Sequence, residues 1–151
     1  MKEELMEKLI RIAIEEAQSA IQEGNSPFGA LLINKNGDII TQAHNTTTTD
    51  CDPTAHAEIN ILRNAAKKLK TKNLSEYTLV SNAESCPMCM SAAIKAKITS
   101  FIFGAKSENH MNPNINVFEI ARKCNNQINI TTGILMKECT EQIKNVRLKE
   151  I

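Results

Sequence analysis

The sequence lacks a long hydrophobic run and an excess of charge of either sign. No stretch reaches the roughly 18 consecutive apolar residues of a membrane-spanning helix. The N-terminal segment carries acidic residues throughout and no small-residue cleavage site, so we expect a cytoplasmic protein without a secretory signal. A net charge of +1, from 18 Lys and Arg against 17 Asp and Glu, argues against a dedicated non-specific nucleic-acid binder, although it does not exclude a local basic patch.

Cysteine and histidine are also scarce, with 5 and 3 residues respectively. An odd number of cysteines in a chain without a leader indicates reduced thiols, so metal binding or catalysis accounts for any patterned pair better than a disulfide does. A chain of 151 residues has the size of one domain and needs no disulfides to stabilise its core. We find no repeat, linker or low-complexity segment, and we expect a single domain over residues 1–151.

Periodicity and turn residues predict an initial hairpin, after which helices alternate with single strands. Asn36-Gly37 between two apolar runs is typical of an antiparallel hairpin. Asp52 before Pro53 predicts the start of the second helix, with Asp as its cap. The expected helices cover 2–22, 54–70, 87–96, 117–124 and a segment from residue 135 onward; the expected strands cover 28–33, 39–41, 77–80, 98–104 and 128–132. This order predicts an α/β fold with three layers, α/β/α, around a mixed sheet.

Two short motifs place possible metal ligands close together in the sequence. Cys86 and Cys89 are three residues apart at an expected helix start, where the backbone amides favour thiolates. His56 lies in the first turn of its own expected helix. One imidazole and two thiolates form a Zn²⁺ ligand set with one open position, whereas structural zinc sites are closed by a fourth protein ligand.

Glu58 lies two residues after this histidine and supplies the remaining chemistry of a hydrolytic zinc site. Hydrolysis needs a group that takes and returns protons, and a carboxylate beside the metal can do so without binding it. Side chains two apart on an ideal helix point about 200° from each other. We therefore expect His56 and Glu58 to converge only if they lie near a helix end or across the edge of an intervening strand.

Each motif taken singly has a less specific interpretation. A Cys-x-x-Cys pair alone can be a redox pair or two core thiols, and His-x-Glu alone is common by chance. A closed structural zinc site would need a fourth ligand, for which the candidates are Cys51, Cys124, Cys139 and His44. None of these four belongs to a second spaced motif. The combination of His-x-Glu with Cys-x-x-Cys is the signature of zinc-dependent deaminases.

At this point the chain resembles the cytidine deaminase superfamily over almost its whole length. Residues 26–30 (SPFGA) and 43–45 (AHN) resemble the first two strand motifs of the guanine deaminase and nucleoside deaminase branch. Residues 52–58 (DPTAHAE) match both that branch and the tRNA adenosine deaminases. Residues 130–135 (ITTGIL) with Glu138-Cys139 resemble the C-terminal segment that both share.

The resemblance implies a five-stranded sheet, one catalytic zinc ion per chain and a homodimer. By position it implies that His56, Cys86 and Cys89 bind zinc and that Glu58 transfers protons. Residues 1–151 are therefore expected to form one zinc-dependent deaminase domain, in which water attacks the ring carbon that bears the amino group, and ammonia leaves.

The resemblance also implies that Asn45 holds the base, with the backbone around Ala57 and with Phe28. A strand-end asparagine that caps a turn is an equally good interpretation of Asn45. Glu84 matches an acidic residue of the relatives, but an exposed turn carboxylate is equally consistent with its position.

The sequence departs from the family pattern at two places. Ser85 stands where relatives usually have Pro, which we expect to loosen the loop without removing a ligand. Residues 105–112 are poor in glycine and positive charge, where tRNA adenosine deaminases carry a Lys-Thr-Gly-Ala-like stretch. We therefore expect a free nucleobase or nucleoside as substrate, with guanine as the best single choice. We expect the loop at 107–118 to decide which ring is accepted.

Three alternatives to guanine remain. A tRNA adenosine deaminase would need a positive surface beside the zinc. A cytosine or cytidine deaminase would use the same ligands. A binding module that has lost catalysis is the non-enzymatic alternative, and the presence of Glu58 argues against it.

Overall fold

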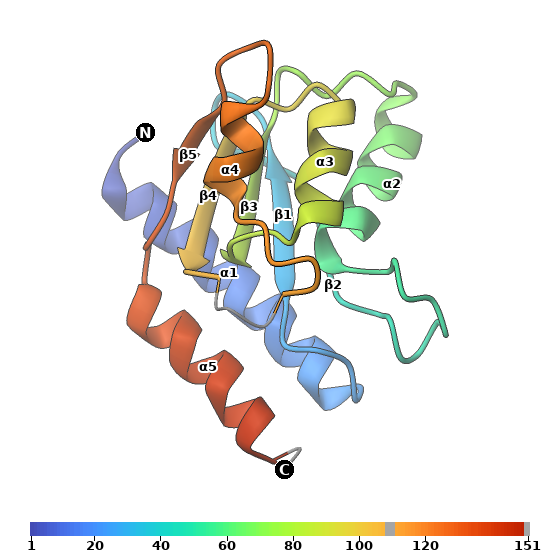
Figure 1. Ribbon diagram of the computed structural model, residues 1–151, viewed down its shortest axis with the longest axis vertical. Coiled ribbons are helices and arrows are strands. Elements are labelled where there is room, and N and C mark those ends of the chain that lie inside the picture. The colour runs from blue at the N-terminus through green and yellow to red at the C-terminus, as the bar shows by residue number, and fades with distance from the viewer. Residues whose placement is uncertain (108–110, 150–151) are drawn as a thin grey trace.

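The computed structural model describes residues 1–107 and 111–149, and it has the expected alternation of helices and strands (Figure 1). Its elements are α1 (Glu3–Gln22), β1 (Gly29–Ile33), β2 (Ile39–His44), α2 (Ala57–Leu69), β3 (Thr78–Ala83), α3 (Pro87–Lys95), β4 (Ser100–Ala105), α4 (Val117–Arg122), β5 (Asn129–Thr131) and α5 (Met136–Lys149). In the part of the chain so described, no helix is both long and apolar enough to cross a lipid bilayer.

The strands form one mixed sheet in the order β2-β1-β3-β4-β5. β1 runs antiparallel to both β2 and β3, whereas β3, β4 and β5 run parallel to one another. The parallel pairs require crossover connections, which α3 and α4 supply. The expected mixed sheet of five strands within an α/β/α fold is therefore confirmed, as is the antiparallel hairpin.

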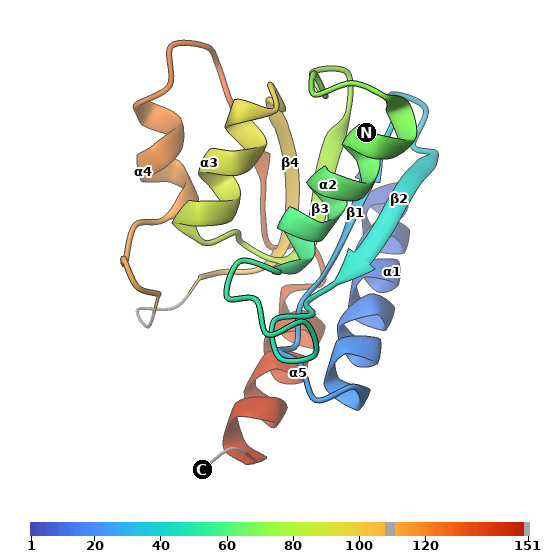
Figure 2. The same ribbon diagram turned by 90° about the vertical axis from the view of Figure 1, so that its right-hand side faces the viewer.

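Helices cover both faces of the sheet, with α1 and α5 on one side and α2, α3 and α4 on the other (Figure 2). Successive side chains of a strand point to opposite faces, so one strand serves both layers. In β1, Ala30 and Leu32 pack with residues of α2 and α3, whereas Leu31 and Ile33 pack with residues of α1. All five residues of β1 are buried, which makes it the centre of the core.

The layer formed by α1 is packed tightly against the start of β1. A Cβ atom added at Gly29 would meet the carbonyl oxygen of Ala13 and would lie 2.6 Å from the amide nitrogen of Ala17. Only glycine leaves enough space for this approach of strand and helix. The close contact fixes the position of the start of β1 and of Phe28, the residue before it.

The second helix begins later than the sequence indicates. The expectation of a start at residue 54, capped by Asp52, is wrong, because α2 begins at Ala57 with His56 as the N-cap residue. The Asp52 carboxylate instead accepts hydrogen bonds from the backbone amide and hydroxyl of Thr54, at 2.8 and 2.7 Å. Such a turn competes with the helix for the same residue types. Residues 53 and 54 therefore form a turn, and the helix begins only after His56.

Candidate active site

The three possible metal ligands lie where two neighbouring helices begin. His56 is the N-cap residue of α2, Cys86 is the N-cap residue of α3, and Cys89 lies in the first turn of α3. Pro87 occupies the first position of α3, where its fixed backbone angle favours a helix start. The two helices run side by side and contact each other (Figure 1), and their first turns lie close together, so segments thirty residues apart in sequence meet there.

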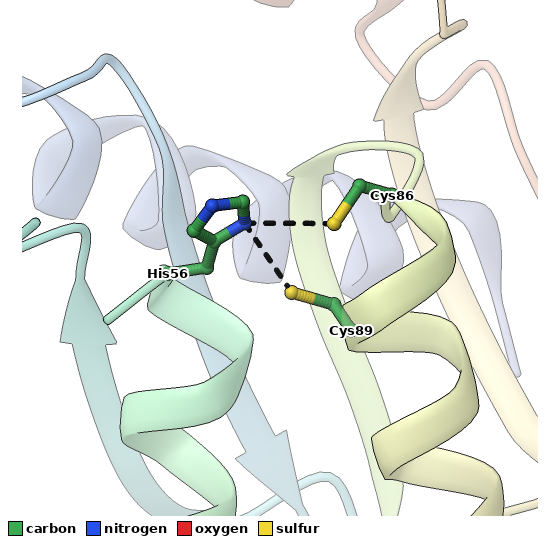
Figure 3. A group of neighbouring side chains, drawn as sticks. All are labelled: His56, Cys86 and Cys89. Atoms are coloured by element: carbon green, nitrogen blue, oxygen red, sulfur yellow. Dashed lines mark hydrogen bonds between the residues drawn. The ribbon is translucent and has the colours of Figure 1, made fainter. Parts of the chain in front are cut away.

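The distances between the donor atoms suit a tetrahedral zinc ion. Nδ1 of His56 lies 3.6 Å from Sγ of Cys86 and 3.5 Å from Sγ of Cys89 (Figure 3). Zinc–nitrogen and zinc–sulfur bonds of about 2.1 and about 2.3 Å, at an angle of about 109°, would place nitrogen and sulfur about 3.6 Å apart. The three side chains therefore fit the ion that the sequence predicts.

Hydrogen bonds among the same side chains shift their pKa values in a way that favours one thiolate, which attracts a cation. A hydrogen bond from Cys89, together with His56, lowers the pKa of Cys86 to about 4, although burial opposes the shift. The hydrogen bond to Cys86 and burial raise the pKa of Cys89. The bond to Cys86 likewise raises the pKa of His56. The pair of thiols thus shares a negative charge, and a ligating cation removes the second proton.

The side chains considered as a possible fourth zinc ligand contact other groups and do not lie in the ligand group. Among the described residues, only His56, Cys86 and Cys89 form a group of potential ligands within 4.8 Å of one another. Both ring nitrogens of His44 contact carboxylates of α1 and its C-cap, at 2.7 Å from Glu16 and 2.8 Å from Glu23. Each of the three remaining cysteine thiols lies near the backbone carbonyl of another residue; these cysteines are Cys51, Cys124 and Cys139. The group thus has three protein donors, as catalytic zinc sites do.

Glu58 lies beside this group without belonging to it. His56 has an extended backbone, with φ −68° and ψ 156°, so the helical angle between positions two apart does not apply to this pair. Glu58 is only 5% exposed, and burial, followed by the charge of Cys86, raises its pKa. His56 and a hydrogen bond from Ser85 oppose that shift. A buried carboxylate with a raised pKa next to a metal site is suited to proton transfer.

The residues expected to hold a base lie on the loops next to the ligands. The Asn45 amide donates to the carbonyl of Phe28 at 3.0 Å, and the next amide, of Thr46, donates to the carbonyl of Ala55 at 3.0 Å. These bonds place Asn45 and Phe28 beside the segment that leads to His56 and the buried Ala57.

The side chain of Asn45 does cap a turn, as is common for an asparagine at the end of a strand. Its Oδ1 accepts bonds from the amide and hydroxyl of Thr47, at 3.0 and 2.8 Å. Among the described residues its Nδ2 donates no hydrogen bond. The capping role and a base-binding role are therefore compatible, because they use different atoms.

Glu84 connects two loops rather than facing solvent freely. One carboxylate oxygen accepts bonds from the amide and the hydroxyl of Ser107, both at 3.2 Å, and the other accepts a bond from Thr132 at 2.6 Å. These bonds hold the chain that leaves β4 against the chain that leaves β5. The loop at 107–118, which we expect to select the ring, includes residues 108–110, which lie outside the described residues.

Two contacts near the site are not predicted by the sequence. Asn82, at the end of β3, is fully buried and accepts a bond from the Gly29 amide while it donates to the carbonyl of Pro27, each at 3.0 Å. Ser85 donates to Glu58. A buried amide in an apolar strand and a hydroxyl in place of proline are the signals that could have found them.

The comparisons with known proteins agree with this geometry. Residues 3–105 match the family described as the cytidine and deoxycytidylate deaminase zinc-binding region, and the chain therefore belongs to this family. It is a zinc-dependent enzyme that removes amino groups by hydrolysis, as the motifs indicate.

Relatives with two different substrates are similar to the chain. A tRNA-specific adenosine deaminase of Haemophilus influenzae is 34% identical over 145 residues, which cover 95% of this chain and 83% of the relative. A guanine deaminase of Bacillus subtilis is 35% identical over 104 residues, covering 69% and 64% of the two chains. A solved structure from a study of A-to-I editing by tRNA:A34 deaminases is 28% identical, with a TM-score of 0.80, and covers 89% of this chain and 98% of its own.

Proposed function

We propose that this protein converts adenosine to inosine in a tRNA by hydrolytic deamination at a zinc centre. The observation that carries the hydrolytic part is the separation of 3.5–3.6 Å between the His56 imidazole and two thiols, with a buried carboxylate alongside. The substrate is supported by the tRNA adenosine deaminase relative, which aligns with 95% of the chain.

In this proposal His56, Cys86 and Cys89 hold the zinc ion, since their donor atoms suit a tetrahedral arrangement and Cys86 is already poised as a thiolate. When bound, zinc supplies a Lewis acid that lets water ionise near neutral pH. The three residues lie at the starts of α2 and α3, and the loop that follows Asn45 is bonded to the segment before His56.

Glu58 then performs the proton transfers. Its carboxylate takes a proton from the attacking water and delivers it to a ring nitrogen. It then takes the remaining proton of the hydroxyl group added to the ring carbon and delivers it to the amino group. The carbon–nitrogen bond breaks, ammonia leaves, and a carbonyl remains on the ring. Burial of Glu58 supports this role, because a carboxyl group with a raised pKa both accepts and donates protons readily.

Substrate binding is assigned to the loops around Asn45. The Nδ2 atom of Asn45 offers a donor to a ring nitrogen or carbonyl, and its other side-chain atom already fixes its orientation through Thr47. Phe28, which is partly buried against both core layers, offers an apolar edge. The backbone at Ala57 lies at the helix start beside the ligand His56.

Guanine is the second candidate substrate, and the sequence supports it by itself. Residues 105–112 are poor in positive charge, and the net charge of the chain is only +1, neither of which favours a large polyanion. The Bacillus subtilis guanine deaminase is similar at 35% identity. The tRNA relative aligns over more of the chain, so we place adenosine in tRNA first.

The test uses purified, zinc-loaded protein. It is incubated with a tRNA that carries adenosine at the wobble position and, separately, with guanine, adenine, cytosine and their nucleosides. Inosine in the tRNA without ammonia from the free compounds would support the proposal. Ammonia from guanine with unchanged tRNA would establish the second candidate instead. Turnover of neither class, with one zinc ion per chain, would contradict both.

We further propose that residues 1–151 act as one deaminase domain, that the protein works in the cytoplasm and that it forms a homodimer. The resemblance to the family supports the dimer, as do exposed apolar side chains around α4, among them Phe118 at 41% exposure. Light scattering after gel filtration would give twice the chain mass of 16.8 kDa for a dimer. A mass of one chain at micromolar concentration would contradict it.

A further inference from the structure

Ser85 occupies a position that the zinc chemistry itself does not explain. It lies between the end of β3 and Cys86, the N-cap residue of α3, and it is only 2% exposed. A buried hydroxyl needs a hydrogen-bond partner, because burial without one costs about 1–3 kcal/mol. The partner of Ser85 is a side chain of the other ligand-bearing helix, α2.

The hydroxyl of Ser85 donates to Oε2 of Glu58 at 2.8 Å. This length is that of a good O–H···O bond, and bonds to an ionised carboxylate are stronger than bonds between neutral groups. Both residues are buried, at 2% and 5% exposure, so water does not compete strongly for the bond. The bond joins the chain before Cys86 to the helix that follows His56.

The contact leaves the two oxygens of Glu58 in different situations. Oε2 is bonded to Ser85, whereas Oε1 is not. A terminal carboxylate torsion rotates easily on its own. The bond to Ser85 therefore restricts the rotation of the Glu58 carboxylate.

We propose that Ser85 is a positioning residue that holds Glu58 in the orientation for proton transfer, through the hydrogen bond to Oε2. The inference rests on the proposed hydrolytic function. Proline, the residue that the resemblance leads us to expect at this position, has no hydroxyl and cannot make the bond. The substitution in this chain therefore supplies a donor that the usual residue does not.

The local backbone allows a clean test. The amide of Ser85 donates to no other group of the described residues, so both alanine and proline remove the hydroxyl without breaking a backbone hydrogen bond. Ser81 supplies a matched control, because it is also buried in the same segment, at 1% exposure, and its hydroxyl contacts only the amide of Ala83.

We expect Ser85→Ala and Ser85→Pro to lower kcat about tenfold while KM changes less than about twofold, because a misplaced base affects the chemical step rather than binding. Ser85→Thr, which keeps a hydroxyl, should restore most of the activity. Ser81→Ala should behave like the unaltered protein. Bound zinc should stay near one ion per chain in all four variants.

Unaltered kcat in zinc-loaded Ser85→Ala and Ser85→Pro would overturn the inference, as would an equal loss in Ser85→Thr or in Ser81→Ala. A second readout does not need activity. Denaturant midpoints are measured for Ser85→Ala, Glu58→Ala and the double variant, and the effect of Ser85→Ala should disappear once Glu58 is absent. Additive midpoints would overturn the contact. If the unaltered protein is inactive but the midpoints are coupled, the proposed function fails while the contact stands.

Discussion

Glu58 lies close to the proposed metal ligands, but it does not belong to the group of side chains that could bind the ion. The variant Glu58→Gln keeps the size and the hydrogen-bond acceptor of the side chain but cannot carry the proton. We expect kcat to fall by about 10²–10⁴-fold, which is the usual contribution of a general acid–base group. Zinc analysis should still find one ion per chain.

The matched variant is His56→Ala, which removes a proposed ligand and should lower both zinc content and activity. Loss of zinc in Glu58→Gln would contradict the assignment of Glu58 as a proton carrier rather than a ligand.

At this scale the sequence predicted the ligand group better than the residues around it. The spacing of Cys86 and Cys89 and the neighbouring His56 identified three side chains that the structure brings within 4.8 Å. The role of Ser85 was not predictable, because it depends on a contact across 27 positions of sequence. The two interpretations of Asn45 were also not separable, since one amide side chain serves a turn with one atom and leaves another free.

At the scale of elements, His44 joins the edge strand β2 to α1 through Glu16 and Glu23. Burial alone lowers the pKa of His44, but the bonds and charges of the two glutamates outweigh it, and the pKa is raised from 6.5. A raised folded-state pKa gives stability that is fully present below the unfolded pKa and is lost as pH rises through the folded value.

We therefore expect the difference in free energy of unfolding between the unaltered protein and His44→Gln to be largest near pH 5.5. It should shrink by up to about 1 kcal/mol by pH 8.5, a size typical of partly exposed ion pairs. Urea denaturation across this range measures both proteins, and subtraction removes the titration of all other groups. A difference that is constant with pH would contradict the contribution of His44.

The contact of β1 with α1 makes a second prediction at this scale. Gly29→Ala would place a Cβ atom 2.6 Å from the backbone nitrogen of Ala17. We expect a loss of about 1–3 kcal/mol in the free energy of unfolding, because strand and helix must move apart. Ser91→Ala, on the exposed side of α3, is the control and should change stability by less than about 0.5 kcal/mol. If Gly29→Ala had the same free energy of unfolding as the unaltered protein, β1 and α1 could move apart at little cost, and the prediction would be wrong.

Element types were predictable from periodicity, and element boundaries less so. The hairpin and the α/β/α order follow from apolar spacing and Asn36-Gly37, and the structure confirms them. The predicted start of α2 was wrong because Asp52 and Pro53 are typical of a helix start and also of a tight turn. The bonds from Thr54 decide between the two, and sequence spacing does not contain them.

For the whole molecule, a zinc ion held by the proposed ligands would link α2 to α3, since each helix carries part of the ligand set. A ligand that binds only the folded state stabilises it by about 4 kcal/mol at a thousandfold excess over its dissociation constant. For a chain of this length we expect chelation of zinc to lower the melting temperature by roughly 10 °C.

Calorimetry before and after chelation measures the shift, and added zinc should reverse it whereas magnesium should not. His56→Ala should show no response to the chelator. A melting temperature that is independent of zinc in the unaltered protein would contradict a role of the ion in stability.

The antiparallel pairing of β1 with β3 has a consequence for the order of assembly. The turn that carries Cys86 follows β3 directly, so we expect the sulfurs to reach their final positions beside His56 only after β3 has joined β1. Tight capture of an ion should then follow a long-range event in folding. The appearance of cobalt–thiolate colour in a refolding sample would mark the moment at which the centre of the sheet closes.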